Sequence, residues 1–173
     1  MEQMTTTSSI GAMLARELRT LQRELLAYPD EREIWAAPPG LPNTAGSLAL
    51  HAAGNLQHFI GTVLGRTGYV RDRDAEFQRR DVPRVELVRE LEAAIEAVQR
   101  TLPALPEGAL QDWYPLPVAN RRLRTGDFLA HLAVHLAYHL GQVDYHRRTV
   151  TGLGDSVGAV APAELWSARP VEP

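Results

Sequence analysis

The chain contains no cysteine among its 173 residues. This absence excludes a disulfide framework, a thiolate zinc site, an iron–sulfur cluster and a cysteine nucleophile. Thiol chemistry would therefore need a thiol from outside the protein. A basic surface is missing as well, because the formal net charge is −3, and phosphate binding relies on concentrated positive charge. We do not expect nucleic acid as a partner.

Long apolar runs are also absent from the sequence. The longest ones are far shorter than the roughly 20 residues that cross a bilayer as a helix. The N-terminal segment MEQMTTTSSIGAM lacks the basic start and the apolar stretch of a secretory signal. We therefore expect a cytoplasmic protein without membrane association.

Apolar residues recur with the helical period through most of the chain, and sustained strand-like alternation is missing. A chain of this length is sufficient for one core. Capping residues and helix breakers divide the pattern into four amphipathic segments, at about residues 8–28, 43–68, 81–102 and 125–148. We predict an all-α fold, with a four-helix bundle over residues 1–150 and an irregular C-terminal tail over residues 151–173.

Two long connectors separate the predicted helices. The segment VRDRDAEFQRRD is dense in charge, and we interpret it as an exposed, solvated connector between the second and third helices. Residues 103–124 contain several prolines and form an irregular connection before the fourth helix. Sites in helical bundles are built in the core from side chains on facing helices. We therefore look for candidate site residues on the helices.

The predicted fourth helix carries a column of histidines. Its segment HLAVHLAYHLGQVDYH holds four of the six histidines of the chain. His131, His135 and His139 are spaced by four residues, and Gln142 and His146 share their helix face. A single buried histidine is usually a core residue with satisfied hydrogen bonds. Several on one face each need a partner, which a metal ion would supply.

One helix cannot complete such a metal site. The axial rise from His131 to His139 is about 12 Å, so one ion would bind an adjacent pair and take a third ligand from another helix. The second helix offers His51 and His58, which share a face because they lie seven residues apart. We favour His51, because the small residues that follow it would allow a close approach to the fourth helix: Ala52, Ala53 and Gly54. Bulky residues follow His58, which we expect to support a ligand or to lie at the surface.

Two familiar metal sites do not fit the sequence. Zinc proteases of the His-Glu-x-x-His type need a glutamate after the first histidine, which neither HLAVH nor HLAYH contains. Di-iron bundles need Glu-x-x-His, which does not occur in the chain. A mononuclear three-histidine site with open coordination positions remains. Imidazole binds zinc, nickel, iron and copper, so the sequence predicts a divalent transition metal without identifying it.

Two segments of the chain resemble the DinB/YfiT-like metal-binding four-helix bundles. NTAGSLALHAAGNLQHFIG is similar to the family helix that carries Asn, Ser, His and Gly-Asn in this order, and HLAVHLAYHLGQV is similar to its His-x-x-x-His helix with Gly-Gln. The resemblance implies a left-handed bundle with an up-down-down-up path and a long crossover. It makes His51, His135 and His139 the metal ligands and leaves His131 one turn outside the site. It also places Gln142 as a hydrogen-bonding partner beside the ion.

The same resemblance suggests an activity and partners. Characterised relatives include thiol-dependent transferases and isomerases that use mycothiol, bacillithiol or glutathione. An external low-molecular-weight thiol and a small-molecule electrophile are therefore the implied substrates, and a homodimer is implied because two-fold dimers are common in the family. The family often has a basic residue or histidine where this chain has Leu140, so the resemblance assigns no role to that position.

A metal ion held by three neutral imidazoles is also a Lewis acid that is able to activate water. We therefore predict a metal-dependent enzyme, either a thiol S-transferase or a hydrolase, in which the sequence identifies no catalytic side chain. The alternative is a non-catalytic helical bundle. In that case the metal or the histidine cluster is structural, and the function is association with itself or with a partner.

Overall fold

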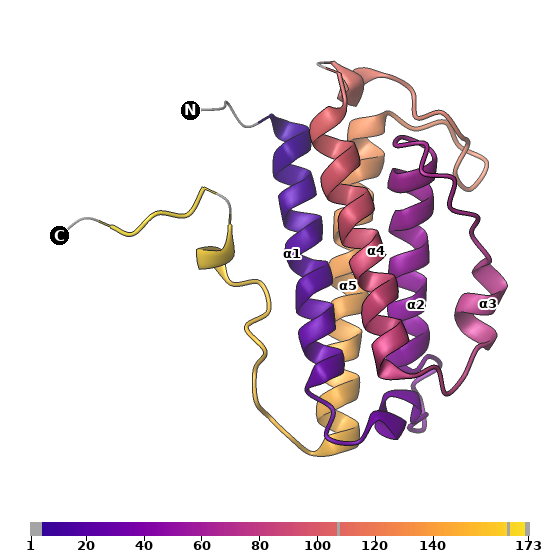
Figure 1. Cartoon of the computed structure of the whole chain (residues 1–173), viewed down its shortest axis with the longest axis vertical. Coiled ribbons are helices and arrows are strands. Elements are labelled where there is room, and N and C mark those ends of the chain that lie inside the picture. The colour runs from indigo at the N-terminus through magenta and orange to yellow at the C-terminus, as the bar shows by residue number, and fades with distance from the viewer. Residues whose placement is uncertain (1–4, 107, 166, 172–173) are drawn as a thin grey trace.

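The computed structural model describes residues 5–106, 108–165 and 167–171. In these ranges the chain forms helices and turns, with no β-strand beyond two isolated bridge pairs. Four long helices pack together, as Figure 1 shows: α1 (Thr6–Leu26), α2 (Ala45–Leu56), α4 (Arg84–Thr101) and α5 (Thr125–Thr151). The predicted all-α four-helix bundle is confirmed.

The long helices follow the up-down-down-up path that the family resemblance implies. α1 and α5 run in one direction, and α2 and α4 run in the opposite direction (Figure 1). α1 packs against α4 and α5, and α2 packs against the same two helices. A π-helical segment, Gln57–Thr62, continues α2. Because α2 and α4 are parallel, the chain between them, residues 63–83, has to return along the length of the bundle.

Local capping explains where the helices begin and end. Thr5 caps α1, because its side-chain oxygen accepts a hydrogen bond from the N–H of Ser8. Thr44 and Ser47 form a capping box at the start of α2, within the predicted run of capping residues. α5 ends at Gly152, whose φ of 72° favours a residue without a Cβ atom.

The apolar stripes of the long helices meet in one core. α1 contributes a row of leucines, and α5 contributes a second row, all at most 3% exposed: Leu14, Leu18, Leu21, Leu25, Phe128, Leu132, Leu136, Leu140 and Val143. Burial of each such side chain stabilises the fold by about 1.5–3 kcal/mol. This inward row fixes the rotation of α5 about its axis, and with it the direction of the histidine column.

The charged connector differs from the predicted solvated loop. It contains a short helix, α3 (Arg73–Gln78), which is capped by Asp72 and packs against α2. Glu76 on this helix is only 5% exposed. Hydrogen bonds with Arg71 and His51 compensate the buried carboxylate. One acidic residue of the connector thus belongs to the interior.

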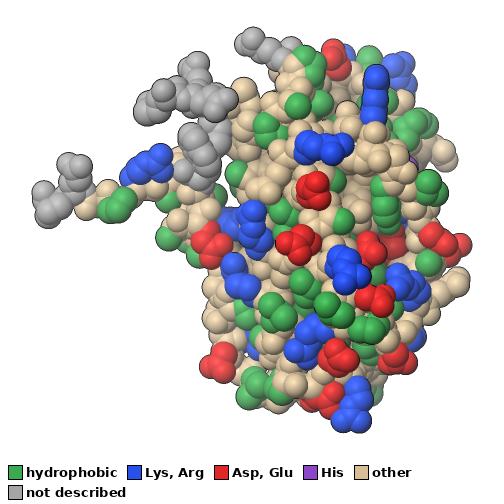
Figure 2. Space-filling view, in the orientation of Figure 1, with side chains coloured by type: hydrophobic (Ala, Val, Ile, Leu, Met, Phe, Trp, Pro, Cys, Tyr) green, Lys and Arg blue, Asp and Glu red, His purple; other side chains and the backbone are tan. Residues whose placement is uncertain are grey.

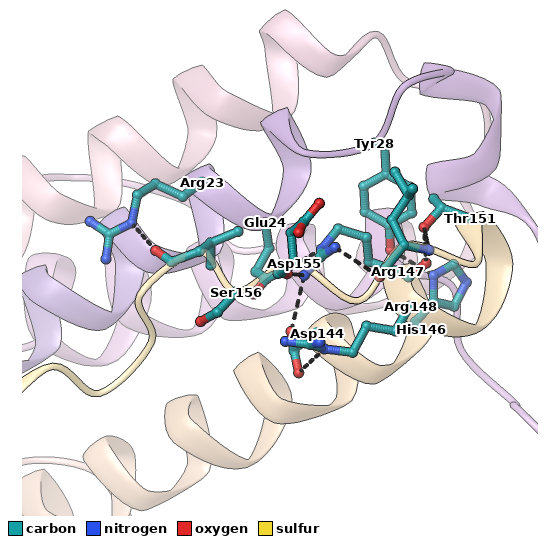
Figure 3. Close-up of polar contacts among 12 residues, drawn as sticks. Arg23, Glu24, Tyr28, Asp144, His146, Arg147, Arg148, Thr151, Asp155 and Ser156 are labelled. Atoms are coloured by element: carbon teal, nitrogen blue, oxygen red, sulfur yellow. Dashed lines mark hydrogen bonds and ion pairs between the residues drawn. The ribbon is translucent and has the colours of Figure 1, made fainter.

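Over its described residues, the C-terminal tail is irregular apart from one 3-10 turn, Pro162–Glu164, and it returns along α1 (Figure 1). Arginines attach it to the bundle through backbone carbonyls. Arg147 donates to the oxygen of Asp155 at 2.8 Å, and Arg23 donates to that of Val157 at 3.0 Å. Figure 3 shows Arg147 between Glu24 of α1 and this segment. Polar contacts therefore hold much of the tail.

The surface formed by α1 and α4 carries charges of both signs. Figure 2 shows acidic and arginine side chains interspersed on this face, without a large patch of one sign. Among the described residues, none of the helices combines the length and the apolar character that a membrane span needs.

Candidate metal site

Three histidines from two helices converge on one point. His51 lies on α2, and His135 and His139 lie one turn apart on α5. Nε2 of His135 is 3.4 Å from Nε2 of His51 and 3.1 Å from Nε2 of His139. One ring nitrogen of each histidine lies within 4.8 Å of the other two, so the group is able to hold a metal ion. The structure thus brings together the three residues that the resemblance selects as ligands.

Two neighbouring side chains fix the orientation of these rings. Glu76 Oε2 lies 2.8 Å from Nδ1 of His51, and Gln142 Oε1 lies 2.7 Å from Nδ1 of His139. A carboxylate and an amide oxygen only accept hydrogen bonds, so each Nδ1 donates its ring proton to them. Arg71 Nη2 also lies 3.3 Å from Nδ1 of His51, but it donates to Glu76 Oε2 at the shorter distance of 2.8 Å. The Nε2 atoms of His51 and His139 then present lone pairs to the common point, as in metal-binding histidines.

The three histidines have too few ring protons for each Nε2 atom of the cluster to take part in a hydrogen bond with another. Nε2 of neutral His135 carries at most one proton, which it is able to donate to His51 or to His139. At least one lone pair therefore faces the cluster without a proton, which is unfavourable in a partly buried site. Ligand atoms at ~2.0–2.1 Å from a tetrahedral ion lie roughly 3.4 Å apart, close to the 3.1 and 3.4 Å found here. Both the donor set and its spacing fit a divalent transition metal.

The local environment keeps the rings of His135 and His139 neutral. Desolvation, together with the neighbouring histidines, lowers the pKa of His135 to about 4. Desolvation also lowers the pKa of His139, although a side-chain hydrogen bond acts in the opposite direction. Burial would raise the pKa of Glu76, but hydrogen bonds from Arg71 and His51 lower it overall. The site therefore combines an ionised carboxylate with neutral rings at His135 and His139, and the neutral ring is the form of histidine that binds metal.

Glu76 and Arg71 are site residues that the sequence interpretation missed. Arg71 donates from Nε to Oε1 of Glu76 at 2.6 Å and from Nη2 to Oε2 at 2.8 Å, a two-pronged contact that fixes the carboxylate. Gly54 provides the space, because a Cβ atom there would clash with Glu76 Oε1. The small residue after His51 thus admits α3, whereas the sequence interpretation assigned it to a contact with the fourth helix. Gly54 was the signal in the sequence that another segment approaches α2 closely at this position. Helical periodicity does not identify that segment as the one that carries Glu76.

The remaining candidate residues lie at different distances from the cluster. His58 is half-buried against Phe59, with ring centroids 4.9 Å apart, and is outside the three-histidine group. It lies about 10 Å further along the helix axis than His51. His131 is exposed, and its ring stacks near that of His135 at 6.0 Å. Gln142 contacts His139 directly.

His146 belongs to a separate buried cluster. Its Nδ1 lies 2.7 Å from the hydroxyl oxygen of Tyr28, and its Nε2 lies 2.9 Å from the carbonyl oxygen of Ala36. The carbonyl only accepts, so Nε2 donates to Ala36 and Nδ1 accepts from Tyr28. Both ring nitrogens are therefore satisfied by the protein. Desolvation lowers the pKa of His146, which also keeps this ring neutral.

The histidine cluster is reached from the flank of α5. Leu132 and Leu136 are buried in the core, whereas His135 and His139 are half-buried and His131 is exposed. The column therefore borders the solvent instead of pointing at the centre of the bundle. The rings of His135 and His139 are therefore in partial contact with solvent on this side.

Comparison with known protein families gives one result. Residues 14–143 match the DinB superfamily. Searches of curated proteins and of solved structures returned no match. The matched range runs from α1 into α5 and includes all three clustered histidines as well as Glu76. The chain belongs to the DinB superfamily.

Proposed function

We propose that the protein is a metal-dependent enzyme that joins an external thiol to a small electrophile. One observation carries the proposal. One ring nitrogen each of His51, His135 and His139 converges on a common point, and the rings of His135 and His139 border the solvent. Structural metal sites are usually closed by a fourth protein ligand, whereas catalytic sites keep a position open. Three histidine ligands at an accessible flank match the catalytic type.

The metal requirement and the external thiol follow from the donor set. A divalent transition metal bound by these histidines would supply Lewis acidity and would favour the thiolate form of an incoming thiol. The chain has no cysteine, so the sulfur has to come from a low-molecular-weight co-substrate. In the transfer the thiol loses its proton, a sulfur–carbon bond forms, and the leaving group of the electrophile departs with the bonding electron pair.

The surrounding side chains position the ligands. Glu76, itself held by Arg71, orients His51, and Gln142 orients His139. Phe77 packs on the ring of His51 at a centroid distance of 4.8 Å. This contact shields the buried side of the site from water, so substrates enter from the α5 flank.

His131 supplies a proton carrier at the mouth of the site. It is exposed and lies one turn before His135. Its imidazole borders both the cluster and the solvent, so it is placed to accept the thiol proton and to release it to bulk water. This role explains an exposed histidine in the column without making it a ligand.

Hydrolysis is the second candidate activity. Water itself reaches the half-buried His135 and His139, and a Lewis acid at this site would also favour ionisation of water. The two activities differ in one requirement, because hydrolysis proceeds without added thiol.

Metal analysis tests the site. Protein without a histidine tag should contain close to one equivalent of zinc, nickel or iron, and His51→Ala and His135→Ala should lose it. His58→Ala is the matched control on the same helical segment and should retain the metal. Equal metal content in His51→Ala and the wild type would refute the site.

Turnover separates the functions. The metal-loaded protein should consume glutathione, mycothiol or bacillithiol together with an electrophile, and His135→Ala should abolish this activity. Ester cleavage without thiol would favour the hydrolase. A metal-loaded protein that turns over neither substrate class would be the non-catalytic bundle.

A further inference from the structure

A closed circuit of side chains lies beside the metal cluster and joins α2, the connector and α5. It includes two of the clustered histidines, and we call it the α2–α5 ring: Phe59, Phe128, His131, His135, His51 and Arg71. Consecutive aromatic side chains in this order have ring centroids 5.1, 6.0, 6.0 and 5.2 Å apart. Arg71 closes the circuit, because its Nη2 lies 3.3 Å from Nδ1 of His51 and its Cζ lies 5.6 Å from the centre of the Phe59 ring. His131 is exposed and Phe59 is half-buried, so part of the ring borders the solvent.

Asn55 lies between two members of the α2–α5 ring. It follows His51 by four residues and precedes Phe59 by four residues, so helical spacing places its side chain between theirs on one face. Asn55 is 7% exposed, and its Oδ1 is buried without a hydrogen-bond partner in the described part of the chain. A buried acceptor that lacks a hydrogen bond is unfavourable. A molecule that binds within the ring is able to supply the missing donor.

Arg71 uses only part of its hydrogen-bonding capacity on Glu76. Nε and Nη2 donate to the two carboxylate oxygens. Nη1 carries two further N–H groups, and it has no hydrogen-bond partner among the described residues. The side chain is 11% exposed, so the surrounding protein holds these donors in place. Guanidinium groups with free donors bind carboxylates well.

The charge balance of the site favours an anionic ligand. The carboxylate of Glu76 is already paired with Arg71, at 2.6 Å between Nε and Oε1, and histidines bind metal as neutral rings. A divalent ion at the cluster would therefore add two positive charges without an acidic ligand to balance them. A molecule with two negative charges, one on a thiolate sulfur at the metal and one on a carboxylate at Arg71, would compensate them.

We propose that Arg71 and Asn55 select the thiol co-substrate by binding the carboxylate and the amide N–H of an N-acylated cysteine unit. Nη1 of Arg71 donates to the carboxylate, and Oδ1 of Asn55 accepts from the N–H, which directs the thiol of the same unit toward the three histidines. Phe59 and Phe128 form the apolar side of this subsite. The inference rests on the proposed thiol-dependent activity and adds the chemical class of the thiol.

Two matched thiols test the carboxylate contact. N-acetylcysteine and N-acetylcysteinamide both contain the thiol and the amide N–H, and only the first has a carboxylate. Isothermal titration calorimetry of the zinc-loaded wild type should give a dissociation constant about tenfold lower for N-acetylcysteine, because a hydrogen bond to a charged group contributes about this factor. Equal dissociation constants would overturn the proposal.

Arg71→Lys tests the residue that binds the carboxylate. Lysine keeps a positive charge beside Glu76 but replaces the planar fork of donors with one compact ammonium group. The ratio of the two dissociation constants should therefore fall toward one. The ratio compares two ligands on the same metal-loaded protein, so a weaker metal affinity does not imitate this result. Arg79→Lys, at an exposed arginine of the same connector, is the matched control and should keep the wild-type ratio. A wild-type ratio in Arg71→Lys would contradict the role of Arg71.

Asn55→Leu tests the contact with the N–H group. It should raise the dissociation constant of N-acetylcysteine roughly fivefold and leave that of 3-mercaptopropionate, which has no N–H, unchanged. The free energy of unfolding should not fall, because an apolar side chain of similar size replaces an acceptor without a partner. A destabilised variant that binds N-acetylcysteine as the wild type does would assign Asn55 a structural role and contradict the proposal.

A sulfur-free pair of ligands separates this inference from the proposed activity. N-acetylalanine should shift the NMR signals of the Asn55 side-chain amide in the metal-free protein, and N-acetylalaninamide should shift them much less, since these contacts need neither metal nor sulfur. Turnover of thiols without a preference for the carboxylate would overturn the subsite alone. Selective binding of N-acetylalanine by a protein that turns over no thiol would support the subsite and refute the activity.

Discussion

His139 and His146 lie two turns apart on the same helix, yet they belong to different kinds of polar cluster. His139 commits one ring nitrogen to Gln142 and leaves the other facing two further histidines. His146 commits both nitrogens to the protein, to Tyr28 and to the Ala36 carbonyl. The sequence pattern places both histidines on the same helix face and does not distinguish them. The difference shows that an unsatisfied nitrogen, more than position on a helix face, marks a candidate metal site.

The two clusters also differ in how deeply their surroundings are buried. Beside His146, Arg147 and Glu24 are 1% and 0% exposed and form a contact of 2.5 Å between Nε and Oε2. Figure 3 shows this cluster between α1, α5 and the start of the tail. The three-histidine cluster borders solvent instead. We therefore assign stability to the first cluster and the proposed metal binding to the second, and four predictions test this division.

Arg147→Met should have the largest effect. It leaves the buried carboxylate of Glu24 without its cation, and Glu24 Oε1 already has no hydrogen-bond partner. The free energy of unfolding should fall by roughly 3–5 kcal/mol, as measured by urea denaturation. The double variant Glu24→Leu/Arg147→Met should recover much of this loss. Metal content per folded protein should not change, and a loss of metal would contradict the division.

His146→Phe and His139→Phe should have opposite consequences. In His146→Phe the Tyr28 hydroxyl and the Ala36 carbonyl lose their partner in the interior, so stability should fall by about 1–3 kcal/mol while metal is retained. His139→Phe should lose metal. Without metal it should be less destabilised than His146→Phe, because it removes a nitrogen from the under-protonated cluster. Equal loss of metal in both variants would contradict the distinction between a metal site at His139 and a structural cluster at His146.

Glu76→Gln should weaken metal binding without unfolding the protein. An amide orients and polarises His51 less well than a carboxylate does, and such supporting residues typically change metal affinity by about 10–100-fold. Competition with a fluorescent chelator measures the dissociation constant. Glu86→Gln, at an exposed residue that pairs with Arg79 at 3.5 Å, is the control. Equal affinities of Glu76→Gln and the wild type would refute this role of α3.

Acid should destabilise the metal-free protein gradually. Burial lowers the pKa of His135 to about 4 and also lowers that of His146. In the unfolded chain both histidines bind protons near pH 6.5, so between about pH 6.5 and 4 the unfolded state takes up more protons. Stability should therefore fall as the pH decreases through this range, and His146→Phe should make the slope shallower. Unfolding free energies that do not vary over this range would contradict the lowered pKa values.

Much of the fold and part of the site follow from the sequence alone. The leucine row of α1 and the capping run before α2 predict the helices, because periodicity and capping are local properties. The spacing of His135 and His139 predicts a ligand pair for the same reason. Selection of His51 over His58 needed the family resemblance as well. Local spacing contained no signal that the π-helical segment begins at Gln57, immediately before His58.

The partners of the histidines could not be predicted from local pattern. Glu76 lies 25 residues from His51 in the chain, and dense charge usually indicates a solvated segment. The roles of His139 and His146 depend on Gln142, Tyr28 and Ala36, only one of which is close in sequence. Tertiary packing determines these contacts.

The insertion of Glu76 beside Gly54 has a consequence for how this protein tolerates sequence change. Connectors between helices usually accept insertions and deletions at little cost to the fold. Here the path from the end of α2 to Glu76 sets the direction of an imidazole in the neighbouring helix. A length change between Thr67 and Asp72 would leave four intact helices and a misdirected ring. Among related chains, changes in the length of this loop should therefore affect the proposed metal binding more than they affect the stability of the fold.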